Sequence, residues 1–272
     1  MVLRNKFISI TLLAIVIGLT VNALLKPEFL PAQQIEKLTT LDVSAIHTIT
    51  INKPNQTVNL SKHDEDWFVL VNNININTDR NLLSHVLKLS QQNVLSIVKD
   101  SDKDLVKYGL TKSNFTISFN DSIIKFGNNE PFTNRRYGLS NDKVYIIDDI
   151  HYRKLLSPTT DFISKSVIQS GQTVTNFRIL WQQKPPIPLP SMKNENLYQN
   201  WQQVKAENIE RYEGQQAIAI ALIQTNFRNI LEFVVIPSKN TLKLARKDLG
   251  IIYVIPKQFM ASLLTYIPTL HN

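Results

Sequence analysis

The chain has 272 residues, of which 43% are hydrophobic, so it is long enough to bury a substantial core and is not intrinsically disordered. Its 7 glycines argue against a glycine-rich cofactor loop, and the absence of cysteine excludes thiol nucleophiles, disulfides, thiolate zinc sites and iron–sulfur clusters. The net charge of +8 is spread along the chain without a block of like charges, so the sequence does not indicate a nucleic-acid-binding tail.

Residues 7–25 contain no charged side chain. As a helix with a rise of ~1.5 Å per residue they are about 28 Å long, close to the ~30 Å hydrocarbon core of a bilayer. Arg4 and Lys6 precede them, and the positive-inside tendency then places residues 1–6 in the cytoplasm. The sequence therefore predicts a single-pass inner-membrane protein with a transmembrane helix or signal anchor, whose carboxy-terminal region is exported to the periplasm.

A cleaved signal peptide is the main alternative, because residues 21–23, Val-Asn-Ala, are small or modest in size, as a signal peptidase requires. The apolar run continues through Leu24 and Leu25, however, and is longer than the ~7–15-residue core of a signal peptide, which favours the anchor. A buried core helix is not indicated, because the run has no polar face.

A linker is predicted over residues 26–44 and a first α+β module over residues 45–170. The module opens with three runs of strand-forming residues, at 47–52, 57–60 and 67–71. Thr78 is the expected N-cap of an amphipathic helix that ends near Gln92, because its leucines and valine fall on one face. This pattern is typical of a surface helix packed on a sheet.

The second half of this module is predicted to be a β-meander. A strand at 94–98 and a short helix at 100–107, ending at Gly109, come first. The remaining expected elements are a hairpin of 115–119 with 123–126, a turn at 127–129, a hairpin of 136–137 with 144–147, and a helix at 149–156.

The end of the chain resembles the end of the first module. Residues 252–264 match residues 144–156 in strand, turn, helix start and a final Leu-Leu. Residues 231–234 likewise resemble residues 123–126, and Trp67 is expected to correspond to Trp201, each opening its unit. These similarities predict a second, abbreviated α+β module over residues 171–272.

The second module contains a proline-rich segment at residues 185–190, which excludes a central strand there. The predicted fold class is therefore α+β: an N-terminal transmembrane helix followed by two related modules, each an antiparallel sheet with helices packed on one side. Trp67 and Trp201 are expected to lie in the cores of their modules.

A set of local motifs resembles one known family. They are Trp67 in an early strand, the amphipathic helix, residues 104–110 (Asp-Leu-Val-Lys-Tyr-Gly-Leu), Phe126-Gly127, Arg136-Tyr137, Val144-Tyr145 and residues 161–165. Together they look like the domain of unknown function 4340 family, with Leu-x-x-Tyr-Gly-Leu as the most specific element. The resemblance covers residues 45–170 well and the remainder loosely.

The resemblance implies one amino-terminal membrane helix and an exported α+β region. Related domains also occur in auxiliary proteins of ABC transporters linked to gliding motility, which implies an envelope or transport-accessory role by association. It supplies no catalytic residue that can be carried over to this sequence.

Arg135, Arg136 and Tyr137 are the candidate ligand-binding residues, because guanidinium groups bind phosphate or carboxylate oxygens bidentately. The competing interpretation is a strand edge with one arginine in solvent and the other beside Tyr137 or an acidic neighbour, and it is favoured. Asp148 and Asp149 lie near His151, yet their place at a predicted helix start favours capping over acid–base chemistry.

Other signals of chemistry are weak. The five histidines lack metal-binding spacings, and no serine lies in a Gly-x-Ser-x-Gly elbow, so we predict neither a metal, a cofactor nor a catalytic residue. The favoured function is a non-catalytic binding, accessory or scaffold component of an inner-membrane complex, with a membrane anchor, a protein partner and no nucleic acid. The alternative is an exported enzyme or small-ligand-binding protein with an anion site at Arg135, Arg136 and Tyr137, beside Asp149.

Overall fold

The computed structural model describes residues 36–99, 104–182 and 196–264. The predicted cytoplasmic residues 1–6, the membrane helix at 7–25, the first part of the linker and the proline-rich segment at 185–190 lie outside the described residues. Among the residues that are described, no helix is both long and apolar enough to cross a membrane. Residues Lys37–Asn272 form one compact unit.

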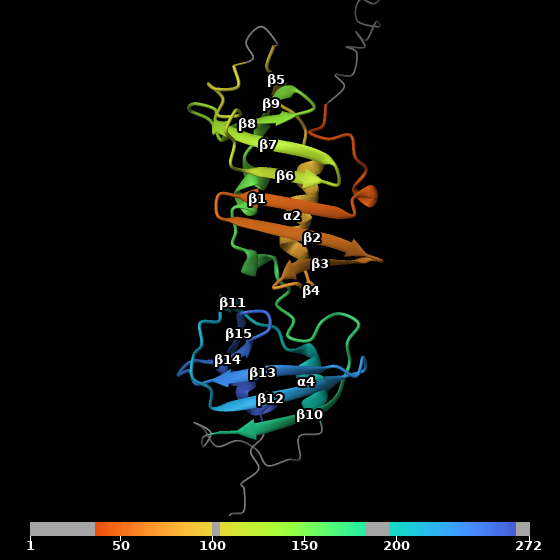
Figure 1. Cartoon of the computed structure of the whole chain (residues 1–272), viewed down its shortest axis with the longest axis vertical. Coiled ribbons are helices and arrows are strands. Elements are labelled where there is room, and N and C mark those ends of the chain that lie inside the picture. The colour runs from red at the N-terminus through yellow and green to blue at the C-terminus, as the bar shows by residue number, and fades with distance from the viewer. Residues whose placement is uncertain (1–35, 100–103, 183–195, 265–272) are drawn as a thin grey trace, which may run out of the picture. The chain divides into compact units, whose positions relative to one another are not determined.

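In this described part, the chain forms a nine-stranded and a six-stranded sheet with few helices, and every strand pairing is antiparallel (Figure 1). The first sheet has the order β4-β3-β2-β1-β6-β7-β8-β9-β5. Its strands are β1 (Thr48–Lys53), β2 (Gln56–His63), β3 (Asp66–Val71), β4 (Ile74–Asn77), β5 (Ser96–Ile97), β6 (Thr116–Phe119), β7 (Ser122–Asn129), β8 (Arg135–Ser140) and β9 (Lys143–Asp148).

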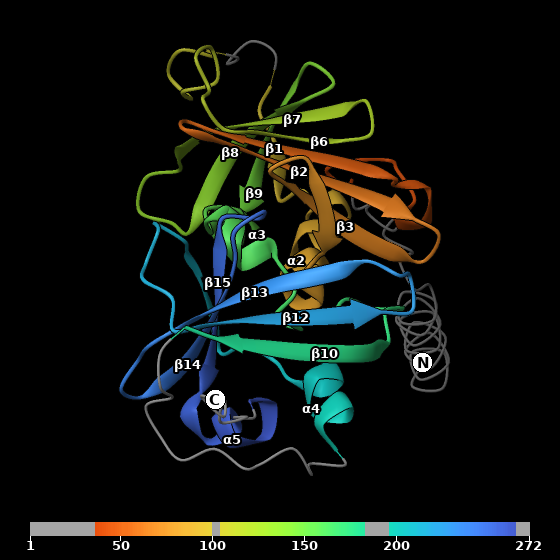
Figure 2. The ribbon, with the colours of Figure 1, turned by 60° about the horizontal axis from the view of Figure 1, so that its bottom comes forward.

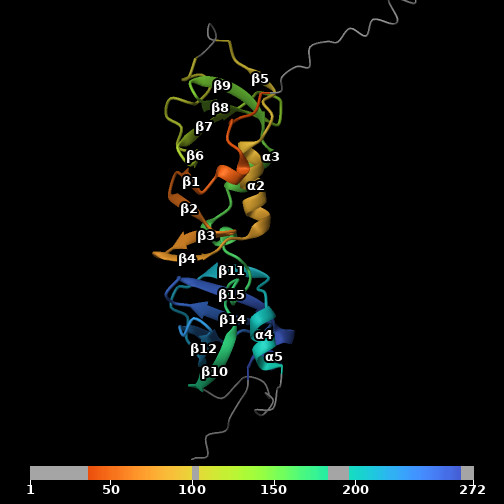
Figure 3. The ribbon, with the colours of Figure 1, turned by 90° about the vertical axis from the view of Figure 1, so that its right-hand side faces the viewer.

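Alternation of apolar residues gives the first sheet one buried face. Ile49 and Ile51 of β1, for example, are fully buried while their neighbours along the strand are not. Two helices, α2 (Arg80–Ser90) and α3 (Ile150–Leu155), lie on the same side of this sheet (Figure 3). The cap of α2 is Asp79, one residue later than expected, because its Oδ1 accepts from the Leu82 amide at 2.9 Å.

The second sheet has the order β10-β12-β13-β14-β15-β11. Its strands are β10 (Val174–Trp181), β11 (Asn208–Arg211), β12 (Ala219–Thr225), β13 (Ile230–Ile236), β14 (Thr241–Arg246) and β15 (Ile251–Pro256). Helices α4 (Leu197–Gln203) and α5 (Met260–Leu263) pack together, because Trp201 is fully buried and its Nε1 donates to the Leu263 carbonyl at 2.8 Å. The described residues also contain three short 3₁₀ helices, η1 (Val43–Ala45), η3 (Thr159–Phe162) and η4 (Lys257–Phe259).

Six strands of the first sheet have the same order as the whole second sheet. The series β1-β6-β7-β8-β9-β5 corresponds to β10-β12-β13-β14-β15-β11, and β2, β3 and β4 are additional. The edge strands also have the same register, since Ile97 pairs with Tyr145 and Ile209 pairs with Tyr253. The pairing of Trp67 with Trp201 was wrong, because Trp67 lies in the additional strand β3 and Trp201 in α4.

Two local predictions in the meander were also wrong. Residues 127–129 form the end of β7 and not a turn. Residues 104–109 form turns and not a helix, with the Asp104 carboxylate accepting the amides of Val106 and Lys107, while residues 100–103 of that predicted helix lie outside the description. Strand β7 continues because the Asn128 amide donates to the Tyr108 carbonyl at 2.8 Å, so the Tyr-Gly-Leu motif packs against the Phe-Gly step.

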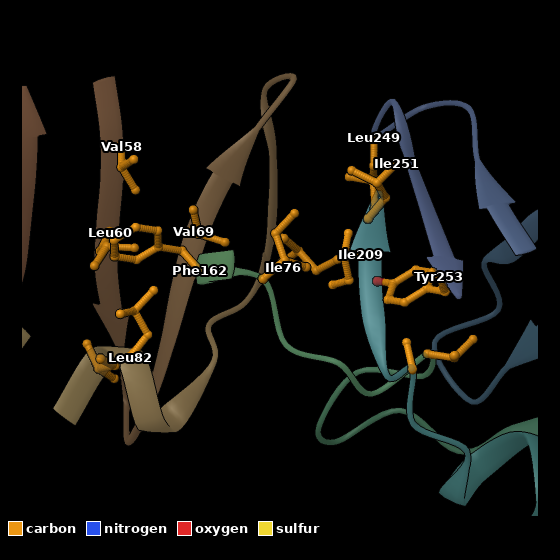
Figure 4. Close-up of a cluster of buried hydrophobic side chains, with 14 of the residues drawn as sticks. Val58, Leu60, Val69, Ile76, Leu82, Phe162, Ile209, Leu249, Ile251 and Tyr253 are labelled. Carbon is orange, nitrogen blue, oxygen red and sulfur yellow. The ribbon is translucent and has the colours of Figure 1, made fainter. Parts of the chain in front are cut away.

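The segment at 163–172 is hydrogen-bonded to both sheets. On the first sheet, the Asn77 carbonyl accepts from the Ser164 amide at 2.8 Å and its Oδ1 accepts from the Ser170 amide at 2.9 Å. Toward the second sheet, the Lys165 carbonyl accepts from the Ala206 amide at 2.8 Å. One buried apolar cluster runs through both sheets, and Figure 4 shows Ile76 of β4 beside Ile209 of β11.

Gly127→Ala is expected to destabilise the fold because a Cβ there would lie 2.2 Å from the Tyr108 carbonyl oxygen. Overpacking of this kind typically costs about 1 to 3 kcal/mol. The matched control is Gly138→Ala on β8, where a Cβ would meet only ordinary contacts at 3.7 Å and beyond. Urea unfolding should separate the two variants, and equal stabilities would contradict the close contact.

Asn77→Ala is expected to lower the free energy of unfolding by about 1 to 3 kcal/mol, because it leaves the Ser170 amide without its acceptor. Asn75→Ala is the control, since Asn75 is exposed on the same strand. The midpoint of urea unfolding of each variant measures the difference. A shift no larger for Asn77→Ala than for Asn75→Ala would show that this amide does not hold the segment.

Candidate functional site

Arg136 of β8 is engaged by neighbouring groups on the helix-covered face of the first sheet. Its Nε donates to Asp149 Oδ1 at 2.7 Å, its Nη1 donates to the Gly127 carbonyl, and its guanidinium lies 3.7 Å from the centre of the Tyr152 ring. The side chains of Arg136 and Asp149 are 13% and 6% exposed. This arginine therefore binds strand β7 and helix α3 together.

Arg135 and Tyr137 lie on the opposite face of β8, because successive side chains of a strand point to opposite sides. Arg135 is half exposed, with its Nη1 3.8 Å from Glu130 Oε2. The Tyr137 ring stacks on Tyr108 with centroids 4.4 Å apart, and burial raises the pKa of the Tyr137 hydroxyl. The structure thus separates Arg136 from the other two predicted ligand-binding residues.

The two aspartates at the start of α3 have different roles. Asp148 ends β9, and its Oδ1 accepts from the Ile150 amide at 2.9 Å, while the N-cap of the helix is Asp149. Asp149 makes no side-chain capping bond and instead pairs with Arg136 and, at 3.2 Å, with Arg153. The prediction of capping was therefore wrong for Asp149, whose carboxylate is buried between two guanidinium groups.

A pair of histidines bridges the two helices of the first sheet, which lie side by side in Figure 2. His85 Nδ1 of α2 lies 3.4 Å from His151 Nδ1 of α3. Burial, together with the electrostatic effect of the neighbouring His85 and Lys88, lowers the pKa of His151. Within the described ranges, no group of three or more His, Cys, Asp or Glu side chains is placed to hold a metal ion.

Lys53, at the end of β1, is the described lysine whose pKa changes most. Burial lowers it to about 8, although the charge of Asp161 opposes the change. Its Nζ donates to the Ser157 carbonyl and lies 5.2 Å from the centre of the Phe162 ring. These contacts attach the β1–β2 hairpin to the residues around η3, so the perturbed amine has a structural explanation.

An apolar groove of about 650 Å³ lies along the carboxy-terminal half of α2. Its apolar lining comes from Val43, Leu87, Leu95 and Ile150, and three of these, all but Leu87, are exposed to solvent. Lys88 lies at the groove and has no ion-pair partner among the described residues. Such an exposed apolar surface is typical of a site for another molecule.

The sequence could not identify this groove, because its lining residues come from four separate elements. The available signal was local: Leu95 and Ile150 are large apolar residues next to turns and helix ends, where exposure is common. Only the packing of η1, α2, α3 and the residues before β5 brings them together.

Asp149→Ala is expected to destabilise the protein by about 3 kcal/mol, because it leaves the Arg136 guanidinium buried without its carboxylate. Arg135→Ala should change stability by less than about 1 kcal/mol, since its pair with Glu130 is long and exposed. Both values follow from urea unfolding monitored by circular dichroism. An Asp149→Ala variant as stable as Arg135→Ala would contradict the structural role of this ion pair.

A family model, described as a domain of unknown function (DUF4340), matches residues 67–216. The match begins at Trp67 in β3, contains the Leu105 to Leu110 motif and covers more than half of the 272-residue chain. No significant match was found among curated proteins or among solved structures. The resemblance based on the motifs of the first sheet is confirmed, and the chain belongs to the DUF4340 family.

Proposed function

We propose that this protein is a membrane-anchored accessory component of an envelope complex, which binds a partner without catalysing a reaction. Residues 7–25 supply the anchor at the inner membrane, and the two sheets lie on its periplasmic side. The resemblance to transporter-linked auxiliary domains makes a transport-related complex the favoured setting. The apolar groove beside α2 is the single observation that carries the proposal, because it offers a partner exposed apolar surface.

The two sheets represent two related modules, residues 45–170 and 171–272, and this duplication is part of the proposal. It is supported by the shared order of six strands and by the equal register of the edge strands. It is also supported by the similarity between residues 144–156 and 252–264. The two matched segments begin at the same position of a strand, the second residue of β9 and of β15. The additional strands β2 to β4 then distinguish the first module from the second.

The partner expected at the groove is an amphipathic protein segment with apolar residues and an acidic side chain. Val43, Leu95 and Ile150 would be buried by the apolar residues, at about 25 cal/mol for each Å² removed from water. The acidic side chain would pair with Lys88, which stands exposed at the last turn of α2. Charge at the rim then selects among apolar partners.

A photo-crosslinking amino acid at position 150 of the full-length, membrane-embedded protein tests this proposal. Crosslinks to one defined envelope protein are expected from position 150, and Leu95→Glu should abolish them because it places a charge on the apolar lining. Position 123 is the matched control, since Ile123 of β7 is 54% exposed and Ile150 is 62% exposed, but Ile123 does not line the groove. The same crosslinked proteins at both positions, or crosslinks unaffected by Leu95→Glu, would refute the groove as the partner site.

The predicted orientation has its own test. A reporter that is active only in the periplasm should be active when fused to the carboxy terminus, because Arg4 and Lys6 precede the apolar run. A reporter active only in the cytoplasm would overturn the location.

A further inference from the structure

A second, more polar hollow lies at the amino-terminal end of α2, away from the apolar groove. This polar cleft has a volume of about 840 Å³ and is lined by the ends of β3 and β4, the first turn of α2, residues 164–171, Gln202 and Lys205. Its size is within the range of small-molecule sites, roughly 300–1,000 Å³. The polar cleft shares no lining residue with the apolar groove, and Arg135, Arg136 and Tyr137 do not line it.

The charges around the cleft balance and are largely engaged. Glu65, Asp66 and Asp79 are matched by Arg80, Lys165 and Lys205. Arg80 lies 3.7 Å from Asp66, Asp79 caps α2, and Lys165 Nζ donates to the Glu207 carbonyl at 2.7 Å. A phosphate or nucleotide site would instead present an excess of cationic donors, so the cleft favours an uncharged ligand.

Uncharged donors and acceptors remain available at the cleft. The side-chain amides of Asn81 and Gln169 make no hydrogen bond to a described residue. Asn77 is only 8% exposed; its Oδ1 accepts from the Ser170 amide, but its Nδ2 has no described hydrogen-bond partner. The Thr78 hydroxyl at the cleft wall is buried and also lacks a partner among the described residues. Asn81 is exposed and Gln169 half-buried, so water can solvate their amides in the free protein. Asn77 is buried, and buried polar groups are normally satisfied, so its Nδ2 indicates a hydrogen-bonding ligand or water at the cleft.

An aromatic surface accompanies these amides. Trp67 of β3 is half-buried, packs against the core and lines the cleft. An indole ring offers a flat apolar face, while an amide offers a donor and an acceptor side by side. A sugar ring has complementary features, since its C–H face is apolar and its neighbouring hydroxyls both donate and accept. A fatty acyl chain would leave the amides unsatisfied, at a cost for each buried polar group.

We infer that the polar cleft binds a neutral oligosaccharide, with Trp67 against a sugar ring and Asn77, Asn81 and Gln169 hydrogen-bonded to its hydroxyls. The ligand would contact both the first sheet and residues 164–171, which the hydrogen bonds of Asn77 already join. Binding therefore stabilises the connection between the sheets. This inference is independent of the apolar groove, which lies along the carboxy-terminal half of α2.

The full-length protein in sugar-free lipid nanodiscs is titrated by calorimetry with four probes: a tetramer of N-acetylglucosamine, maltotetraose, inorganic phosphate and decanoate. At least one oligosaccharide is expected to bind and to raise the melting temperature, while phosphate and decanoate do not bind. Asn81→Ala and Gln169→Ala should each weaken oligosaccharide binding at least tenfold. The fold should be kept, because the described hydrogen bonds of both residues use the backbone carbonyl, which alanine retains.

Asn75→Ala is the matched control, because Asn75 is an exposed asparagine on β4 that does not line the cleft, and its affinity should be unchanged. The inference is overturned if neither oligosaccharide binds at millimolar concentration. It is also overturned if phosphate or decanoate binds in place of the oligosaccharides, or if Asn81→Ala and Gln169→Ala bind as tightly as Asn75→Ala. None of these results bears on crosslinking from position 150, so the two proposals fail separately.

Discussion

The connection between the two sheets depends on the hydrogen bonds that the buried residue Asn77 accepts from Ser164 and Ser170. The backbone carbonyl and the side chain of Asn77 both bind the segment at 163–172, which continues into β10. Because a buried hydrogen bond is strong in low dielectric and costly to leave unmade, this residue sets where the segment lies. The segment places Ile163, Val167 and Ile168 in the shared apolar core, accepts the Ala206 amide through Lys165 and forms one wall of the polar cleft.

The additional strands of the first sheet explain why a cleft is found beside them. Both sheets contain the same six-strand order, but only the first extends it beyond β1 by β2, β3 and β4. Those strands carry Trp67, Ile76 and Asn77, which respectively line the cleft, fill the core next to β11 and bind the connecting segment. If the two modules arose from one, as proposed, the hairpins added to the first copy provided the contact surface between the copies.

The Arg135-Arg136-Tyr137 motif on β8 illustrates which contacts a sequence pattern can predict and which require the fold. Alternation along β8 was sufficient to separate Arg136 from Arg135 and Tyr137, because neighbouring residues of a strand face opposite sides. What the alternation could not supply was Asp149, which reaches Arg136 only because the β8–β9 register places Ile147 opposite that arginine and α3 then turns back over the sheet. A conspicuous arginine pair is thereby explained mainly as one structural and one exposed residue.

The sequence by itself determined most strands of the first sheet, its β6–β7 and β8–β9 hairpins, the amphipathic helix α2 and the similarity between residues 144–156 and 252–264. These depend on local periodicity and turn chemistry, which a one-dimensional pattern contains. It failed at residues 127–129 because the strand continues through a contact with Tyr108, which is distant in sequence. The apolar groove and the polar cleft were decided only by the tertiary structure, since each collects residues from several elements whose proximity depends on strand order, register and packing.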